Sequence, residues 1–322
     1  MSDVRIVTVT LNPAVDRVIE APSFKVGAHV TGHIVAWYPT GRGITISRAF
    51  ANVGVRSIAT GFVGRAELNM FEEYLQRVAH GRAVSQFLVV RARTRDNITI
   101  VDPVEDTDTH IRDAGFKVQP DDVTRISSKL SMLAREGTIM CFGGSLPPGV
   151  TPADFANMVS RCRIQRARVV LDVADNALEA VRDQRIWMVK LNRAQVARLA
   201  GRELANEGDF LQAARSLSAA DSGPFEYVLA TRGAEGAVLF GPNVALLGRV
   251  GVHPGRVVST VGCGESLVAG VIADYLRTGD WSAALHEGMA LATANATGRE
   301  AGAADPEDLA EFREAAMIEP VT

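Results

Sequence analysis

The chain has 322 residues, of which 47% are hydrophobic and 22% are charged, so it can bury a large core and does not belong to the disordered class. A formal net charge of −3 without a basic run argues against nucleic acid as a partner. We recognise neither a signal peptide nor an apolar stretch long enough for a bilayer, and therefore expect a cytoplasmic protein without a membrane partner.

Short apolar runs alternate with helical patterns along most of the chain. In chain order, the pattern predicts strands at 5–11, 57–64, 138–144, 167–174, 186–192 and 226–233, and helices at 44–54, 70–78, 121–134, 153–162, 210–220, 264–276, 281–296 and 306–317. This alternation is typical of an α/β protein with a doubly wound, mostly parallel sheet and helices on both faces. We expect one compact unit.

Two stretches, 12–43 and 86–116, interrupt this alternation with short runs of poor helical periodicity. We interpret them as two insertions that form one small antiparallel sheet attached to the α/β core. Such a sheet can act as a lid over a site. It can equally be an ordinary β-extension.

The cysteines and histidines argue against a metal site. Cys141, Cys162 and Cys263 are odd in number and widely spaced, and the six histidines are scattered. We therefore expect neither a disulfide framework nor a metal held by protein side chains alone.

The clearest candidate site is VVSTVGCGESLVAG, residues 257–270. Gly262 and Gly264 flank Cys263 directly before a helical run, so backbone N–H groups and the helix dipole can bind an anion there. Glu265 can take the proton of an attacking hydroxyl while these amides stabilise charge on a transferring phosphoryl group. The alternative is an acidic helix cap.

Two further glycine turns are weaker signals. PTGRGITISRAF (39–50) leads into a helix and places Arg42 between two glycines, where its guanidinium can clamp a phosphate. TRGAEG (231–236) lies between two strands and can hold a nucleotide phosphate, although it can equally be a hairpin loop.

Four polar residues add weak signals of their own. Asp16, Lys190 and Asn192 follow or end predicted strands, where α/β proteins hold ligands. Arg95 lies in the second insertion and can bring a positive charge over a substrate.

In order, the motifs resemble those of the PfkB branch of the ribokinase-like carbohydrate kinases, in particular its 1-phosphofructokinase and tagatose-6-phosphate kinase members. The matching motifs are VTLNPAVD, TGRGITISRA, TRDNI, GGSLPPGV, VKLN, TRGAEGA and STVGCGES. The resemblance implies a single kinase domain over 1–322 with a β lid often used for homodimerisation. It also implies transfer of the ATP γ-phosphoryl group to a sugar phosphate with Mg²⁺.

Carried over position by position, the resemblance assigns roles to matching residues. It implies that Gly262, Cys263 and Gly264 form the anion hole and that Glu265 is the catalytic base. On the sugar side it implies Asp16, Gly41, Arg42 and Thr45, with Arg95 at the sugar's phosphate. On the nucleotide side it implies Lys190, Asn192, Gln195, Thr231, Arg232, Gly233, Glu235 and Gly236, of which Lys190 and Asn192 are near the ATP phosphates and Mg²⁺.

The chain departs from the family pattern at several of these positions. Glu265 replaces an Asp, which displaces the carboxylate by about 1.5 Å, and Gln195 replaces the acid of an N-x-x-E motif. Arg42 replaces a Lys and Thr45 an Asn, while the usual D-T-S-G reads DVAD (172–175) and the usual S-L-G reads TRG (231–233). Two hypotheses follow. One is a kinase that converts fructose 1-phosphate to fructose 1,6-bisphosphate; the other is an impaired kinase homologue that binds a sugar phosphate or nucleotide as a regulator.

Overall fold

The computed structural model describes residues 5–321 and contains a large and a small β-sheet. The strands are β1 (Arg5–Thr10), β2 (Ala14–Glu20), β3 (His33–Thr40), β4 (Ser57–Gly64), β5 (Ala83–Ser85), β6 (Leu88–Val90), β7 (Arg95–Asp102), β8 (Thr107–Arg112), β9 (Thr138–Gly144), β10 (Arg168–Val173), β11 (Ile186–Asn192), β12 (Phe225–Thr231), β13 (Ala237–Gly241), β14 (Val244–Val250) and β15 (Ala316–Pro320). The large sheet has the order β15-β14-β13-β12-β11-β10-β9-β1-β4-β5, and β6 also pairs with β4. From β4 to β12 its pairs are parallel, which confirms the predicted fold class.

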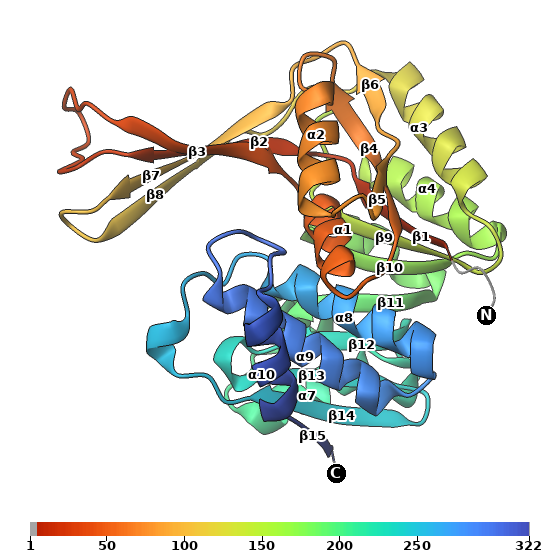
Figure 1. Ribbon diagram of the computed structural model, residues 1–322. Helices are drawn as coiled ribbons and strands as arrows, with labels where there is room; N and C mark the ends of the chain where they lie inside the picture. Colours follow the sequence, from red (N-terminus) through yellow and green to blue (C-terminus); the bar gives the residue numbers. More distant parts are fainter. Residues whose placement is uncertain (1–4, 322) are drawn as a thin grey trace.

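Helices cover both faces of this sheet (Figure 1). They are α1 (Arg42–Asn52), α2 (Leu68–Val78), α3 (Pro120–Leu133), α4 (Pro152–Ile164), α5 (Asp175–Ala180), α6 (Arg193–Ala200), α7 (Glu207–Ser216), α8 (Cys263–Thr278), α9 (Trp281–Thr297) and α10 (Pro306–Ala315). Local signals set several ends: Thr151 and Asp154 form a capping box at the start of α4, and Gly279 ends α8 with a left-handed φ of 72°.

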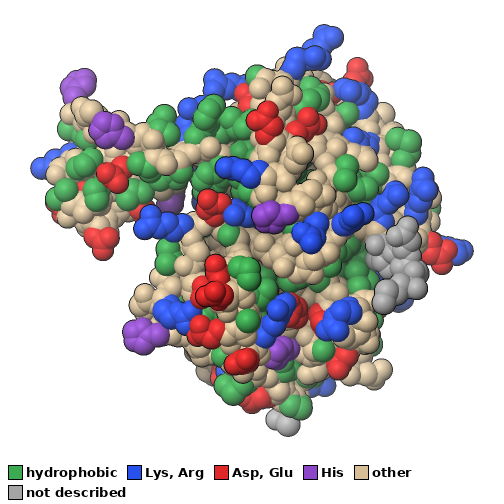
Figure 2. Space-filling model, in the orientation of Figure 1, with side chains coloured by type: hydrophobic (Ala, Val, Ile, Leu, Met, Phe, Trp, Pro, Cys, Tyr) green, Lys and Arg blue, Asp and Glu red, His purple; other side chains and the backbone are tan. Residues whose placement is uncertain are grey.

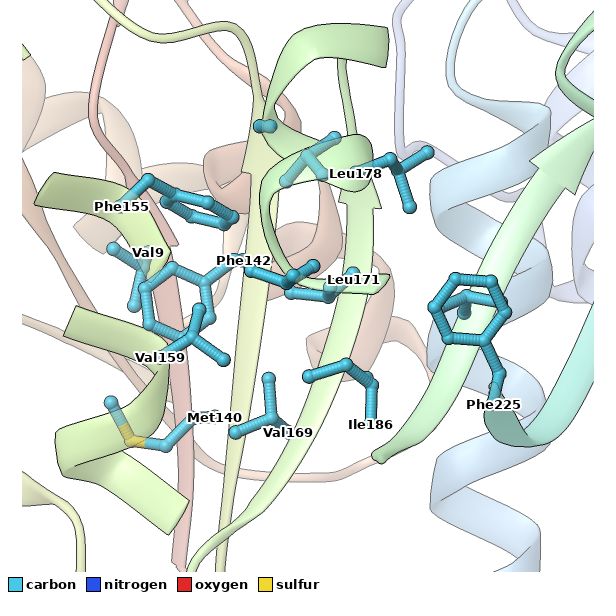
Figure 3. Packing of buried hydrophobic residues seen from close by; sticks show 14 of the residues in the cluster. Val9, Met140, Phe142, Phe155, Val159, Val169, Leu171, Leu178, Ile186 and Phe225 are labelled. Carbon is cyan, nitrogen blue, oxygen red and sulfur yellow. The ribbon is translucent and has the colours of Figure 1, made fainter. Parts of the chain in front are cut away.

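The core lies between the sheet and these two helix layers. On one face, apolar residues of α3 to α7 pack on the sheet, and on the other those of α1, α8, α9 and α10 do so. Figure 3 shows Phe155 and Val159 of α4 against Phe142 of β9, and the rings of Phe142 and Phe155 meet edge to face at 5.6 Å. Because both faces are covered, a central strand such as β11 buries six consecutive residues.

The small sheet has the order β3-β2-β7-β8 and extends away from the core as an arm (Figure 1). Its strands come from the two stretches that interrupt the sequence pattern. β2 pairs antiparallel with β3 and parallel with β7, so the sheet is mixed and not purely antiparallel. The stretches are also wider than the sheet, because β6 belongs to the large sheet and α1 begins at Arg42.

The sequence pattern misses several elements at the edges of the fold. It predicts neither β14 nor β15, and it continues the last helix to residue 317, whereas α10 ends at Ala315 and β15 follows. These strands form an antiparallel edge, β13-β14-β15, where pairing with a distant segment and not local periodicity decides the structure. Every helix within residues 5–321 is too short or too polar to cross a lipid bilayer.

Candidate functional site

Four charged side chains from four elements meet where the parallel strands end and two helices begin. Arg42, the first residue of α1, donates from Nη1 to Asp172 Oδ1 of β10 at 2.8 Å. Its Nε lies 3.5 Å from Oε1 of Glu265, in the first turn of α8. Lys190 of β11 places Nζ 3.4 Å from the same Asp172 oxygen. The cluster holds two cations and two carboxylates at the strand ends, where open α/β sheets bind ligands.

Burial and neighbouring charges shift the pKa values of Glu265 and Arg42 in this cluster. The Asp172 side chain is 1% exposed and its second carboxylate oxygen, Oδ2, has no hydrogen-bond partner. Burial and the charge of Asp172 raise the pKa of Glu265, while Lys190 and Arg42 oppose the rise. Asp172 in turn raises the pKa of Arg42, which stays charged. Glu265 is therefore a carboxylate with a raised pKa in the first turn of α8. A raised pKa is a common property of carboxylates that act as catalytic bases.

The turn before α8 has the geometry that the sequence predicts for an anion site. Gly262 adopts a left-handed φ of 88°, and a Cβ there would lie 2.8 Å from Asn295 Oδ1 and from the backbone of 301–302. The helix begins at Cys263, and the N-cap residue, Gly262, has no side chain that could cap it. Glu265 is the acidic residue of the first turn, and a hydrogen bond from its own backbone N–H opposes the rise in its pKa, so the alternative of an acidic helix cap also describes this turn. The Cys263 N–H donates weakly to the Thr260 carbonyl at 3.4 Å, and the positive end of the helix dipole lies at this turn.

Asn295 of α9 holds this turn, and the sequence analysis misses it. Its Nδ2 donates to the Val261 carbonyl at 2.9 Å and lies 3.3 Å from Cys263 Sγ, and its Oδ1 accepts from the Gly302 N–H at 2.6 Å. Asn295 is 1% exposed and lies in the last turn of α9, after the largely apolar segment MALATA, residues 289–294. A single amide at the end of this segment is the signal that the sequence offers, because a buried polar group needs hydrogen-bond partners. Burial also raises the pKa of the Cys263 thiol.

Glycines allow the close approaches in the charge cluster. A Cβ on Gly264 would overlap the end of the Lys190 side chain, so this glycine lets Lys190 lie against the first turn of α8. A Cβ on Gly143 would lie 2.7 Å from Arg42 Cβ. The absence of side chains at both positions brings Lys190 and Arg42 to the same end of the sheet.

Gly41 and Thr45 lie at the start of α1. Gly41 has a φ of 149°, and a Cβ there would lie 2.6 Å from Thr10 Cγ2, so the tight turn before the helix requires glycine. Thr45 is 7% exposed and its N–H donates to the Gly41 carbonyl. The burial of Thr45 leaves little of it accessible to a ligand.

The end of β11 joins three of the residues predicted on the nucleotide side. Asn192 and Gln195 form the capping box of α6, each side chain accepting from the backbone N–H of the other. Gln195 Nε2 also donates to Asp175 Oδ1 at 3.1 Å. Thr231 of β12 stands opposite Asn192 in the parallel register. Asn192, Gln195 and Thr231 therefore lie near the carboxyl ends of the same neighbouring strands as Lys190.

The TRGAEG turn is a hairpin connection between β12 and β13, which pair antiparallel. Arg232 is buried, and its guanidinium pairs with Glu207 at 2.6 Å and with Glu235 at 3.0 Å. The side chains of Arg232 and Glu235 are thus already paired with protein groups. Gly233 has a left-handed φ of 61° with open space around it, whereas a Cβ on Gly236 would overlap a backbone oxygen of β14.

Asp16 and Arg95 lie on the small sheet, where β2 and β7 pair. Asn97 donates to Asp16 Oδ1 at 2.8 Å, and burial raises the pKa of Asp16 although this hydrogen bond opposes the rise. The Arg95 guanidinium donates to three backbone carbonyls, those of Asn12, Pro13 and Asp113. Arg95 therefore joins the loop after β1 to the loop after β8.

Potential metal ligands do not cluster in the described part of the chain. Within residues 5–321, no group of three or more His, Cys, Asp or Glu side chains is placed to hold a metal ion. The donor set therefore does not fit a resident metal.

Comparisons with known proteins identify the family of the chain. The pattern of the family described as pfkB family carbohydrate kinase matches residues 9–308. The 1-phosphofructokinase of Escherichia coli strain K12 is 29% identical over 318 residues, 98% of each protein, and that of Rhodobacter capsulatus is 31% identical over 271 residues, 83% of each. The crystal structure of phosphofructokinase-2 from Escherichia coli in complex with potassium superposes with a TM-score of 0.85 at 23% identity, covering 97% of this chain and 98% of that one. The sequence resemblance is thereby confirmed, and the chain belongs to the pfkB family of carbohydrate kinases.

Proposed function

We propose that this protein transfers the γ-phosphoryl group of ATP to a sugar phosphate, and that it converts fructose 1-phosphate to fructose 1,6-bisphosphate. The observation that carries the proposal is the position of Glu265, a carboxylate of raised pKa within the first turn of α8, directly after the Gly262 turn. The relatives named 1-phosphofructokinase, which match over nearly the whole chain, support this choice of substrate.

In the proposed step, the free primary hydroxyl oxygen of the sugar phosphate attacks the γ-phosphorus. The new O–P bond forms as the bond between the γ-phosphorus and the β,γ-bridging oxygen breaks, and ADP leaves with that electron pair. Glu265 accepts the hydroxyl proton and later releases it to water. The amides of Gly262, Cys263 and Gly264 stabilise the charge on the transferring group, because this chemistry depends on positioning and charge neutralisation more than on covalent steps.

We assign the binding roles to the two sides of the cluster. Lys190 faces the ATP phosphates, next to the strand ends that carry Asn192, Gln195 and Thr231. Backbone groups of the open turn at Gly233 complete the nucleotide side, because Arg232 and Glu235 are paired with protein groups. On the sugar side we assign Arg42, Gly41 and Asp16, with Arg95 and Thr45 shaping the site through their backbone contacts. Mg²⁺ enters with the nucleotide.

One observation favours a second function, that of a regulator which binds a sugar phosphate or nucleotide without turnover. Gln195 carries an amide where the family pattern has an acid, and this amide is used in the capping box and in the contact with Asp175. The Asp175 carboxylate is also paired with Arg198. This strand end therefore offers little free negative charge to a metal–nucleotide complex.

A coupled assay of ADP release with ATP, Mg²⁺ and fructose 1-phosphate tests the kinase proposal. Fructose 6-phosphate, tagatose 6-phosphate and unphosphorylated fructose serve as comparison acceptors. We expect Glu265→Gln to lower kcat by at least about 10²-fold, the usual contribution of a general base, and Glu265→Asp to retain part of the activity. The kinase proposal fails if no sugar phosphate is turned over. Ligand-induced thermal stabilisation without turnover would then support the regulator.

We also propose that two copies of the chain associate through the small sheet. Figure 2 shows hydrophobic side chains along the arm, and the exposed ones include Ile34, Val35 and Trp37 of β3 and Ile111 of β8, each more than half exposed. Exposed apolar side chains gathered in one part of a protein, here the small sheet, mark interaction surfaces. Light scattering should report a dimer that Trp37→Ser weakens, whereas Met132→Ser on α3 should not. A monomeric native protein would refute the proposal.

A further inference from the structure

Arg42 contacts both acids of the charge cluster through different nitrogens. Its Nη1 donates to Asp172 Oδ1 at 2.8 Å and to the Asp172 carbonyl at 3.2 Å, whereas its Nε faces Glu265 Oε1 at 3.5 Å. The guanidinium is planar and rigid, so anchoring one end determines where the other end lies. Asp172 is buried at the end of β10 and therefore sets the position of Nε.

The contact between Arg42 and Glu265 is an ion pair and not a hydrogen bond. A separation of 3.5 Å exceeds the usual 2.7–3.2 Å of an N–H···O bond, but it is close enough for strong charge attraction. Among the described residues, no side chain donates a hydrogen bond to the Glu265 carboxylate, and its own backbone N–H is the donor that opposes the rise in its pKa. One carboxylate oxygen therefore remains available to accept a proton from a bound hydroxyl.

Two cations of the cluster act on Glu265, but in different ways. Lys190 of β11 opposes the rise in the Glu265 pKa, ahead of Arg42, but its ammonium lies against Asp172 and is not within ion-pair distance of Glu265. Asp172 repels a Glu265 carboxylate, and Cys263 on the same helix has a thiol whose pKa is raised by burial. Arg42 is the cation that forms an ion pair with Glu265 itself.

We propose that Arg42 is the positioning residue for Glu265: the guanidinium, anchored on Asp172, holds the Glu265 carboxylate ionised and in place at the first turn of α8. A lysine would be a less effective substitute, because a single ammonium lacks the two separate nitrogens that reach Asp172 and Glu265 at once. The catalytic consequence rests on the proposed function. The effect on the charge state of Glu265 does not require turnover.

Titration of Glu265 by carboxyl carbon-13 nuclear magnetic resonance tests this inference. Glu265→Gln identifies the resonance, and Arg42→Met and Arg42→Lys are the test variants. Arg313→Met is the control, since it removes an arginine paired with Glu287 between α10 and α9. Loss of a cation within 4 Å should raise the pKa of Glu265 by about one unit in Arg42→Met, less in Arg42→Lys, and not at all in the control.

Two outcomes overturn the inference: an unchanged Glu265 pKa in Arg42→Met, or an equal shift in Arg313→Met. If Arg42→Met does not fold, the decision rests on Arg42→Lys, for which an unchanged pKa has the same meaning. In an active enzyme, the acid limb of the pH profile of kcat should move to higher pH with the Glu265 pKa. If the protein transfers no phosphoryl group, the proposed function fails while the titration still decides the role of Arg42.

Discussion

Replacing Gly264 with alanine should separate activity from stability. Gly264 is the second residue of α8, and a Cβ there would lie 2.7 Å from Lys190 Cε and closer still to Nζ. The three atoms nearest to the new methyl group outside its own helix backbone all belong to the Lys190 side chain. The flexible end of Lys190 must therefore move, and the helix need not.

The magnitude follows from these distances. To reach the 3.4 Å of an ordinary contact, Lys190 Cε must retreat by about 0.7 Å, the difference between 3.4 and 2.7 Å, and the ammonium must move with it. A misplacement on the order of 1 Å in a reacting site costs about 10²-fold in rate, so we expect a loss of about 10- to 100-fold in kcat/KM. Alanine in place of a helical glycine gains about 0.5–1 kcal/mol, which offsets the displacement of Lys190. The free energy of unfolding should change little.

The assay compares kcat/KM for ATP with the midpoint of urea unfolding in Gly264→Ala and in Gly270→Ala on the same helix. A Cβ on Gly270 would lie 2.7 Å from the Gly288 Cα of α9, a backbone atom that cannot give way easily. Gly270→Ala should thus destabilise the fold by about 1–3 kcal/mol. Unchanged kinetics in Gly264→Ala, or a rate loss that merely follows a loss of stability, would refute the reasoning.

Three further predictions follow from buried polar groups. The acid limb of the pH profile of kcat/KM should lie above pH 4.5, the ordinary pKa of a glutamate, because burial and Asp172 raise the pKa of Glu265 and only the deprotonated carboxylate accepts a proton. An acid limb at or below pH 4.5 would contradict the assignment of Glu265 as the base. Burial raises the pKa of Asp102, but four backbone N–H donors together lower it below 3.8. The Asp102 carboxylate therefore stabilises the fold fully above the pKa of the unfolded chain, and this stabilisation is lost as the pH falls through the pKa of the folded protein. Asp102→Asn should flatten the decrease in the urea midpoint between about pH 5 and 2.5. Asn295→Ala leaves the Val261 carbonyl and the Gly302 N–H without a partner, and each unsatisfied group costs about 1–3 kcal/mol of stability. The variant should therefore have a lower melting temperature and a lower kcat. A variant of native stability would rule out this role for Asn295.

Much of the candidate site could be predicted because it depends on backbone features with local signals. The Gly-Cys-Gly turn before α8 and the polar residues at strand ends are visible in the sequence, and parallel strands bring such ends to one edge of a sheet. Arg42, Lys190 and Glu265 do meet there. The partners of these side chains could not be predicted in the same way. Asn295 reaches the turn from the next helix, and Arg232 forms ion pairs with Glu207 and Glu235 inside the fold.

The amino-acid sequence by itself determined the alternation of strands and helices through the central part of the sheet, the α/β class and the family, because hydrophobic periodicity and glycine turns act over a few residues. Only the tertiary structure decided that Arg42 lies between Asp172 and Glu265. These three residues are separated by more than ninety positions along the chain, and their charges interact only after the sheet and α8 are packed. The same packing removes the carboxylates from water, and this raises the pKa of Glu265. Local sequence determines where a helix starts, whereas folding determines the charge environment at that start.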